Sequence, residues 1–420
     1  MIAAPGSGSG KTTVTLALLR FLRNLGHEVR GAKSGPDYID PRFHAAACGV
    51  ECVNLDAWSM TPARLLHLAE GPGTLIVEAA MGLFDGAPPE GRGSAAELAR
   101  VLGLPVVLVV NASHMAQSVA ALVAGFAHHD PRVTVAGVIL NNVGSERHER
   151  MLRAALERVR LPVLAALRRN GNLALPSRHL GLVQAGERGD LDAFLDRAAG
   201  ALGETLEVER VLSLAAPLVQ PPAAGGGRRF APPGQRIAVA RDAAFAFAYP
   251  HMLNDWRVAG AEISFFSPLA DEPVPAADFV FLPGGYPELH AGRLSAASVF
   301  MKSLRMAAQS IDIYGECGGY MMLGESLVDA GGVAHSMAGL LPLVTSFERR
   351  RLHLGYRRMR ALRGPFQGEF NGHEFHYAST LEARGQPMFR NCDAEGSEMP
   401  DAGLVEGRVA GSFLHLVDVR

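Results

Sequence analysis

Residues 4–13 read Ala4-Pro5-Gly6-Ser7-Gly8-Ser9-Gly10-Lys11-Thr12-Thr13, a glycine-rich stretch between a short apolar start and a helical pattern. Glycines let backbone N–H groups turn toward phosphate oxygens, and a helix N-terminus adds partial positive charge. The pattern is typical of a P-loop, in which Lys11 reaches the outer phosphates and Thr12 offers its hydroxyl to Mg²⁺. We therefore predict an ATP site formed by Gly8, Gly10, Lys11, Thr12 and Thr13.

A glycine and serine turn before an amphipathic helix is the alternative interpretation, and Pro5 departs from the usual Gly or Ala of a P-loop. The lysine content argues against it. The chain has 40 lysines and arginines together, yet lysine stands only at Lys11, Lys33 and Lys302. Because arginine is the usual cation of this chain, a lysine at the P-loop position indicates a need for a compact ammonium group.

The composition describes a globular protein with two domains. A chain of 420 residues is too long for one ordinary core, and a hydrophobic share of 48% can fill two. The net charge of −2 gives no electrostatic basis for binding nucleic acid or an anionic membrane surface. No apolar run approaches the roughly 20 residues of a membrane span. We expect a cytoplasmic protein without nucleic-acid or membrane partners.

The first two hundred residues alternate strand-like and helical runs, which predicts an α/β domain with a mostly parallel sheet. The predicted strands are Met1–Ala4, Glu28–Lys33, Thr74–Glu78, Pro105–Asn111, Val133–Leu140 and Leu161–Ala165. The predicted helices span residues 13–24, 62–69, 94–102, 115–127 and 147–159.

A second α/β domain follows a linker rich in proline and glycine. We assign residues 1–200 to the first domain, 201–235 to the linker and 236–420 to the second domain. The predicted strands of the second domain are Arg236–Ala240, Glu262–Phe266, Phe279–Leu282 and Ile311–Tyr314.

Carboxylates follow two strands of the first domain, at the sheet edge where α/β proteins bind ligands. Glu78 ends one strand, and Asp37 and Asp40 follow another beside glycine and proline. Taken one at a time, these residues could equally be turn or helix-cap residues. Together on a P-loop sheet, they lead us to predict that Thr12, Asp37 and Glu78 hold Mg²⁺ directly or through water.

The second domain contains a predicted nucleophile. An apolar strand runs into Tyr314-Gly315-Glu316-Cys317-Gly318-Gly319-Tyr320 and then into a helix, a pattern typical of a nucleophile elbow. Such a turn lifts the sulfur of Cys317 clear of the sheet and places it at a helix N-terminus, where we expect the thiolate to be favoured. Cys48, Cys52 and Cys392 lack this setting, and we interpret Cys48 and Cys52 as buried apolar residues.

Several segments resemble the cobyrinate or hydrogenobyrinate a,c-diamide synthases, and the resemblance extends over essentially the whole chain. The segments are Gly35-Pro36-Asp37-Tyr38-Ile39-Asp40, Met81-Gly82-Leu83-Phe84-Asp85-Gly86, Gly137-Val138-Ile139-Leu140-Asn141 and Arg178-His179-Leu180-Gly181-Leu182. The resemblance implies a P-loop ATPase domain like that of dethiobiotin synthetase, joined to a class I glutamine amidotransferase domain. It also implies a corrin or related tetrapyrrole carboxylate and L-glutamine as substrates, and it leaves a homodimer open.

The resemblance also implies roles for individual residues. Asp37, Tyr38 and Asp40 would face the tetrapyrrole side chains or the metal. The N–H groups of Gly285 and Gly318 would stabilise the oxyanion of the tetrahedral intermediate, and His415, in a segment that reads Gly411-Ser412-Phe413-Leu414-His415, would be the base of Cys317.

Two details of the amidotransferase half depart from its simplest pattern. Triad-type relatives carry a glutamate two residues after the base, but this chain has Val417, so Cys317 and His415 act as a dyad or use another orienting group. His373 and His376 are spaced like metal ligands, although the resemblance favours a structural or glutamine-pocket strand there.

The two halves complement each other chemically. Cys317 would release ammonia from glutamine through a thioester, but ammonia does not condense with a carboxylate near neutral pH. The ATP domain would activate the carboxylate as an acyl phosphate, which ammonia then attacks.

Three alternatives remain at this point. A nickel-sirohydrochlorin a,c-diamide synthase and a cobyric acid synthase would share most of these features, although Gly35–Asp40 favours the a,c-diamide branch. A P-loop regulatory ATPase with an inactive amidotransferase-like module comes from another class. The intact elbow at Cys317 and the presence of His415 argue against it.

Overall fold

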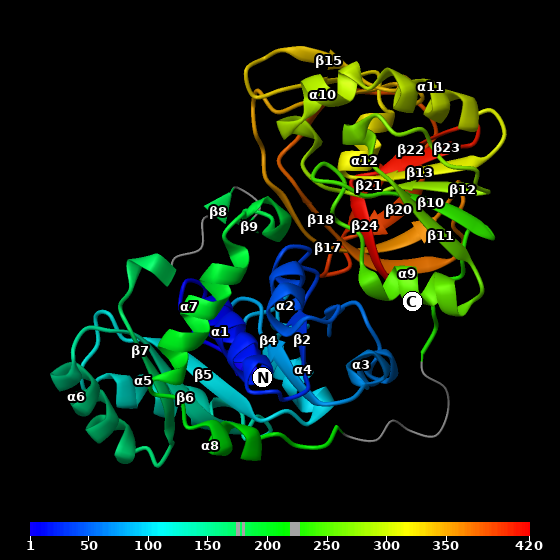
Figure 1. Ribbon diagram of the computed structural model, residues 1–420. Coiled ribbons are helices and arrows are strands. Elements are labelled where there is room, and N and C mark those ends of the chain that lie inside the picture. Colours follow the sequence, from blue (N-terminus) through cyan, green and yellow to red (C-terminus); the bar gives the residue numbers. More distant parts are fainter. Residues whose placement is uncertain (174–176, 179–180, 219–226) are drawn as a thin grey trace. The chain divides into compact units, whose positions relative to one another are not determined.

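The computed structural model describes residues 1–173, 177–178, 181–218 and 227–420, which form two compact units (Figure 1). Unit 1 comprises residues 1–227 and unit 2 comprises residues 228–420. The predicted linker 201–235 starts inside helix α7 (Leu191–Gly203) and contains helix α8 (Val208–Ser213). Its residues 219–226 lie outside the described residues, as do His179 and Leu180 of the motif at 178–182. Among the described residues, no helix has the length and apolar character that crossing a bilayer requires.

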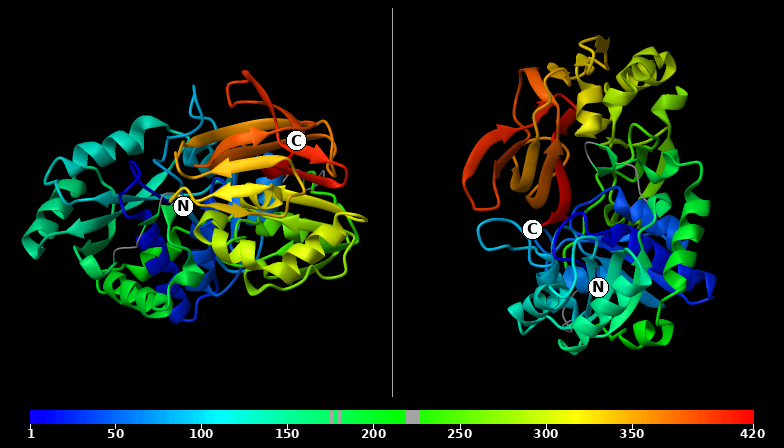
Figure 2. Two further views of the ribbon diagram at one scale, coloured as in Figure 1. Left: turned by 90° about the horizontal axis from the view of Figure 1, so that it is seen from above. Right: turned by 90° about the vertical axis from the view of Figure 1, so that its left-hand side faces the viewer.

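Unit 1 is built on a seven-stranded parallel sheet in the order β3-β2-β4-β1-β5-β6-β7, flanked by helices (Figures 1 and 2). The strands are β1 (Ile2–Ala3), β2 (Val29–Ser34), β3 (Val53–Leu55), β4 (Thr74–Glu78), β5 (Val106–Asn111), β6 (Val135–Val143) and β7 (Val163–Arg168). The short strands β8 (Ser177–Arg178) and β9 (Gly181–Leu182) pair with each other.

The helices of unit 1 pack in groups beside this sheet. They are α1 (Lys11–Asn24), α2 (Asp40–Cys48), α3 (Pro62–Ala69), α4 (Ala95–Leu102), α5 (Val119–His129) and α6 (Glu146–Glu157), besides α7 and α8. Helix α1 packs on α2 and α7, α3 on α4, and α5 on α6. The predicted α/β class is confirmed. The short strand β3 and helix α2 were not anticipated, because Gly35, Pro36 and Asp37 just before α2 read as a turn.

Unit 2 contains a six-stranded sheet in the order β11-β10-β12-β13-β23-β22, parallel except for its edge strand β22. Its strands are β10 (Arg236–Ala240), β11 (Glu262–Phe266), β12 (Phe279–Leu282), β13 (Asp312–Glu316), β22 (Leu404–Glu406) and β23 (Val409–Ser412). Its helices are α9 (Pro250–Val258), α10 (Ala291–Ala296), α11 (Ser298–Ala307) and α12 (Gly318–Leu323). Large aromatic side chains such as Trp256, Phe279 and Phe281 fill the core.

Two further sheets of unit 2 were not anticipated from the sequence. An antiparallel sheet has the order β21-β20-β17-β18-β24, and a smaller sheet has the order β15-β14-β16-β19. The antiparallel sheet consists of β17 (His353–Ala361), β18 (Glu369–His376), β20 (Phe389–Cys392), β21 (Glu398–Ala402) and β24 (Leu414–Val419). The smaller sheet consists of β14 (Ser326–Val328), β15 (Ala334–Ser336), β16 (Leu343–Ser346) and β19 (Ser379–Ala383). The antiparallel sheet, orange to red in Figure 2, lies on a different side of unit 2 from α10 and α11.

Candidate active site

The glycine-rich loop of unit 1 connects β1 to α1 and has the backbone of a phosphate cradle. Gly8 (φ 77°) and Gly10 (φ 90°) both occupy the left-handed region, which disfavours residues with a Cβ. A Cβ on Gly10 would lie 2.1 Å from Nδ2 of Asn141. That amide donates to the carbonyl of Ser9 at 3.0 Å. Gly10 is therefore favoured by its backbone conformation, and a side chain there would also push the Asn141 amide away from Ser9.

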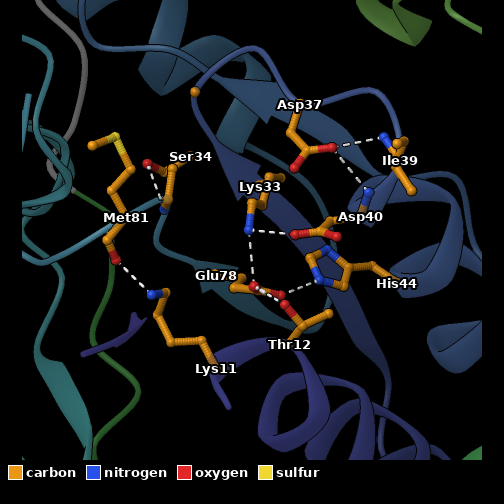
Figure 3. Close-up of polar contacts among 12 residues, drawn as sticks. Lys11, Thr12, Lys33, Ser34, Asp37, Ile39, Asp40, His44, Glu78 and Met81 are labelled. Atoms are coloured by element: carbon orange, nitrogen blue, oxygen red, sulfur yellow. Dashed lines mark hydrogen bonds and ion pairs between the residues drawn. The ribbon is translucent and has the colours of Figure 1, made fainter. Parts of the chain in front are cut away.

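Lys11 is held at this loop by two backbone carbonyls. Its Nζ donates to the backbone oxygen of Gly6 at 3.2 Å. It also donates to the backbone oxygen of Met81, the contact drawn in Figure 3. Burial lowers the pKa of Lys11, and the ammonium of Lys33 lowers it further. The segment that carries Met81 is itself tied to the loop, since the N–H of Leu83 donates to the carbonyl of Ala4 at 2.9 Å. These contacts hold the ammonium group of Lys11 beside the glycine-rich loop.

Thr12 and Glu78, two of the predicted metal ligands, lie together. The Thr12 hydroxyl donates to Oε1 of Glu78 at 2.7 Å. Glu78 ends β4, the parallel neighbour of β1, so the topology brings its buried carboxylate to the first turn of α1. Burial would raise the pKa of Glu78, but the ammonium of Lys33 and the hydrogen bond with His44 hold that pKa well below its usual range.

Lys33 joins Glu78 to Asp40 in a buried cluster. Its Nζ lies 2.6 Å from Oδ2 of Asp40 and 2.8 Å from Oε1 of Glu78. Although burial opposes it, the two carboxylates raise the pKa of Lys33. Burial raises the pKa of Asp40 to about 6, with a further contribution from the Asp37 carboxylate. His44 completes the cluster, with Nε2 2.6 Å from Oε2 of Glu78.

Asp37 has a different setting from Thr12 and Glu78. Its Oδ1 accepts from the backbone N–H groups of Ile39 at 2.7 Å and Asp40 at 3.1 Å, which orders the start of α2. Figure 3 shows Asp37 on the Asp40 side of the cluster, away from Thr12. A direct metal contact by Asp37, and the contacts of Asp37, Tyr38 and Asp40 with substrate, stay predictions.

The turn at Cys317 in unit 2 has the geometry of a nucleophile elbow. Cys317 connects β13 to α12 with φ 46° and ψ −98°, a conformation that disfavours non-glycine residues. Its N–H donates to the carbonyl of Ser412 at 2.8 Å. A Cβ on Gly319 would lie 1.8 Å from the carbonyl oxygen of Leu282, so the turn needs glycine at that position.

The expectation of a favoured thiolate at Cys317 is wrong. Burial raises the pKa of the Cys317 thiol, and the carboxylates of Glu288 and Glu316 add to the increase, although a hydrogen bond with the Gly318 backbone opposes it. Helix α12 spans only Gly318–Leu323, so its terminal charge is small. The thiol is therefore protonated near neutral pH and needs a base.

The structure brings His415 to Cys317 around a shared glycine. A Cβ on Gly284 would lie 2.8 Å from Cε1 of His415 and 3.5 Å from Cβ of Cys317, so both side chains border that residue. The predicted oxyanion donors lie beside them, because a Cβ on Gly318 would be 3.0 Å from the nitrogen of Gly285. The four predicted residues of this site are thus neighbours.

Comparisons with known proteins agree with the two-domain architecture. Residues 1–183 match the CobQ/CobB/MinD/ParA nucleotide binding domain, and residues 236–418 match the CobB/CobQ-like glutamine amidotransferase domain. A hydrogenobyrinate a,c-diamide synthase of Sinorhizobium sp is 56% identical and aligns with 100% of this chain and 98% of its own length. Enzymes of the same name from Brucella anthropi and Rhodobacter capsulatus are each 53% identical over 98% of their lengths.

The chain belongs to the hydrogenobyrinate a,c-diamide synthase family.

In this a,c-diamide synthase family member, sequence reasoning overlooked Lys33 and His44. Lys33 is one of three lysines in the chain, a signal that was available. It stands opposite Glu78 in the β2–β4 ladder, a register that the sequence does not reveal. His44 follows Asp40 by four residues on α2, so the helical period places both on one face.

His373 and His376, whose spacing resembles that of metal ligands, have different partners in the structure. His373 pairs with the hydroxyl of Tyr249 at 2.9 Å and stacks on His415, with ring centroids 4.9 Å apart. Among the described residues, His353, Glu374 and His376 have ligand atoms within 4.8 Å of one another. The Glu374 carboxylate is already paired with Arg357 at 2.7 Å and with Nε2 of His376 at 3.0 Å. We therefore interpret this cluster as a polar network of the antiparallel sheet.

Proposed function

We propose that this chain amidates the a and c acetate carboxylates of hydrogenobyrinate, using ATP and glutamine. The observation that carries the proposal is the presence, in one chain, of a glycine cradle with an aimed lysine and of a strained cysteine bordered by a histidine. Full-length relatives named hydrogenobyrinate a,c-diamide synthase support the choice of a metal-free corrin as the substrate.

Glutamine hydrolysis is the work of unit 2 in this proposal. His415 takes the proton of the Cys317 thiol, and the sulfur attacks the glutamine amide carbon. The backbone N–H groups of Gly285 and Gly318 stabilise the resulting oxyanion. The tetrahedral intermediate expels ammonia, which receives the proton from His415, and water then hydrolyses the glutamyl thioester.

Carboxylate activation is the work of unit 1. The γ-phosphoryl group of ATP passes to a substrate carboxylate oxygen, and ammonia displaces phosphate from the acyl phosphate to form the amide. Lys11 offsets the charge on the transferring phosphoryl group. The Thr12 hydroxyl is an oxygen ligand that suits Mg²⁺, and it lies 2.7 Å from Oε1 of Glu78. Because both oxygens of Glu78 are paired, with Lys33 and with His44, Glu78 would hold Mg²⁺ through water. Bound there, Mg²⁺ would offset phosphate charge.

The loop that precedes α2 is the proposed contact with the ring. Asp37 and Tyr38 are half-buried on this loop, and Asp40 pairs with Lys33 directly behind it. Conservative changes at Tyr38 or Asp40 should therefore alter which acetate is amidated, or stop the reaction at the monoamide. A uniform loss of stability with an unchanged product pattern would instead indicate turn and cap roles.

The proposal is tested with purified protein, ATP, glutamine and one macrocycle at a time. We expect diamide formation from hydrogenobyrinate, and weaker or no reaction with its cobalt counterpart and with nickel-sirohydrochlorin. Cys317→Ser should lose glutamine-dependent amidation and keep ATP-dependent amidation with concentrated ammonium at mildly alkaline pH. Full glutamine-dependent turnover by Cys317→Ser would refute the amidotransferase half of the proposal.

A further inference from the structure

Val417 occupies the position at which triad-type amidotransferases carry a glutamate, and it is a fully buried apolar residue. It cannot orient His415, yet a carboxylate reaches the histidine from another strand. Oε2 of Glu316 lies 3.4 Å from Nδ1 of His415. Both side chains are only 2% exposed, so water does not compete for this contact.

The position of Glu316 follows from the strand pairing. Glu316 is the last residue of β13 and pairs with Ser412 at the end of β23. The chain then passes through Phe413 into β24, where His415 is the second residue. Parallel pairing of β13 with β23 therefore places the residue before the nucleophile next to the start of β24.

Two hydrogen bonds fix the Glu316 carboxylate through its other oxygen. Oε1 accepts from the hydroxyl of Tyr314 at 3.2 Å and from the N–H of Leu416 at 3.1 Å. Because Leu416 directly follows His415, one strand positions both the carboxylate and the imidazole. With Oε1 occupied in this way, Oε2 is the oxygen presented to Nδ1.

The neighbouring histidine cannot take this role. The rings of His373 and His415 are nearly parallel, with an interplanar angle of 7°. His373 therefore lies over the face of the His415 ring, whereas the Nδ1–H bond points outward in the ring plane. Burial and the nearby His415 also lower the pKa of His373 well below its usual value, so it stays neutral.

We propose that Glu316 is the positioning residue for His415, replacing the absent glutamate at position 417 with a carboxylate from the residue immediately before the nucleophile. The inference rests on the proposed function, because it presumes that His415 is the base of Cys317. Glu316 accepts the Nδ1–H bond and keeps Nε2 unprotonated, so Nε2 is available to take the thiol proton. The carboxylate stabilises the imidazolium that forms when His415 takes the proton, as in other triads.

The test compares Glu316→Gln, Glu316→Asp and a matched control in the full chain. We expect Glu316→Gln to lower the glutaminase kcat by about 10²-fold or more, the usual size of a general-base effect, with little change in the KM for glutamine. Glu316→Asp should recover part of the loss, because it keeps the charge. Ammonium-dependent amidation should persist in both. The control is Glu406→Gln, an exposed glutamate of β22 in the same sheet, which should match wild type.

Parallel assays of Cys317→Ser separate the two possible failures. If Cys317→Ser is inactive with glutamine while Glu316→Gln keeps the wild-type kcat, the role of Glu316 is refuted and the proposed function stands. If Cys317→Ser keeps glutamine-dependent turnover, the proposed function itself fails.

A spectroscopic readout covers the case in which Glu316→Gln does not fold. Nitrogen NMR of the wild-type protein should show neutral His415 with the proton on Nδ1. Observation of the proton on Nε2 would overturn the proposal.

Discussion

Lys33 on β2 and Glu78 on β4 stand opposite each other in a parallel ladder and form a buried ion pair of 2.8 Å. Asp40 adds a second carboxylate to the same ammonium at 2.6 Å. The three charges depend on one another, because removal of any one of them leaves a buried charge without its partner.

Removing this cation should destabilise unit 1. We expect Lys33→Met to lower the free energy of unfolding by about 3–5 kcal/mol, because Glu78 and Asp40 would face each other without a cation. Chemical denaturation followed by circular dichroism measures the difference. The control is Lys302→Met on α11, an exposed lysine, which should change stability by less than about 0.5 kcal/mol. If Lys33→Met and Lys302→Met changed the free energy of unfolding equally, Lys33 would not stabilise unit 1 through Glu78 and Asp40.

The pKa of Asp40, raised to about 6, predicts a pH effect of definite sign. Between the ordinary carboxyl pKa and this value, the folded state binds more protons than the unfolded state, so the Asp40 contribution to stability falls as pH rises. Asp40→Asn lacks this effect. The free energy of unfolding of Asp40→Asn, relative to that of wild type, should therefore increase from pH 4.5 to pH 7.5 by up to about 2 kcal/mol. A constant difference across this range, measured by denaturation at each pH, would contradict the raised pKa.

Lys11 should be essential for amidation and dispensable for glutamine hydrolysis. We expect Lys11→Ala to abolish ATP-dependent amidation, because the outer phosphates lose their point charge. Lys11→Arg should be nearly as defective, since a planar guanidinium does not reproduce the compact ammonium that Lys11 places between the carbonyls of Gly6 and Met81. Product analysis together with glutamate release measures the two activities. Retained amidation in Lys11→Ala would remove the cradle from the mechanism.

His415→Ala should lose glutaminase activity about as completely as Cys317→Ser, because the raised pKa of Cys317 leaves little thiolate without a base. The pKa of Cys317 is checked by alkylation with iodoacetamide, followed by peptide mass spectrometry. In His415→Ala the rate of alkylation should keep rising with pH beyond about 9, as a raised thiol pKa requires. A plateau near pH 7 would show instead that the thiolate forms without the histidine.

Local pattern was sufficient for much of the fold, for the glycine-rich loop before α1 and for the turn at Cys317. The roles of Gly285 and His415 were instead expected from the family resemblance, and they stay predictions. Strands Thr74–Glu78, Arg236–Ala240, Glu262–Phe266 and Phe279–Leu282 have the predicted bounds. Their apolar runs are bounded by turn residues, and both properties are local. The antiparallel sheet of unit 2 was missed, although a strand was expected at His373 and His376. Its other strands, such as β17, alternate buried and exposed residues less regularly and pair with partners distant in the sequence.

Glu316 and Lys33 illustrate the limit of such reasoning. Both were visible in the sequence, but their roles depend on which residue stands opposite in a ladder. Lys33 meets Glu78 across the β2–β4 pair, and Glu316 reaches His415 because β13 pairs with β23. Strand order and register are set by the packing of whole sheets, so a single sequence does not specify them.

At Cys317, the residue that the reaction needs differs from the residue that the backbone conformation favours. The combination of φ 46° and ψ −98° is one that glycine adopts readily and that costs other residues about 1–3 kcal/mol. Cys317→Gly should therefore unfold with a higher free energy than Cys317→Ala, the reverse of the usual order for these two residues. Glycine is therefore the most stable residue for this turn, although it cannot act as a nucleophile. The strained conformation of cysteine persists because the packing of the surrounding sheet stabilises the turn.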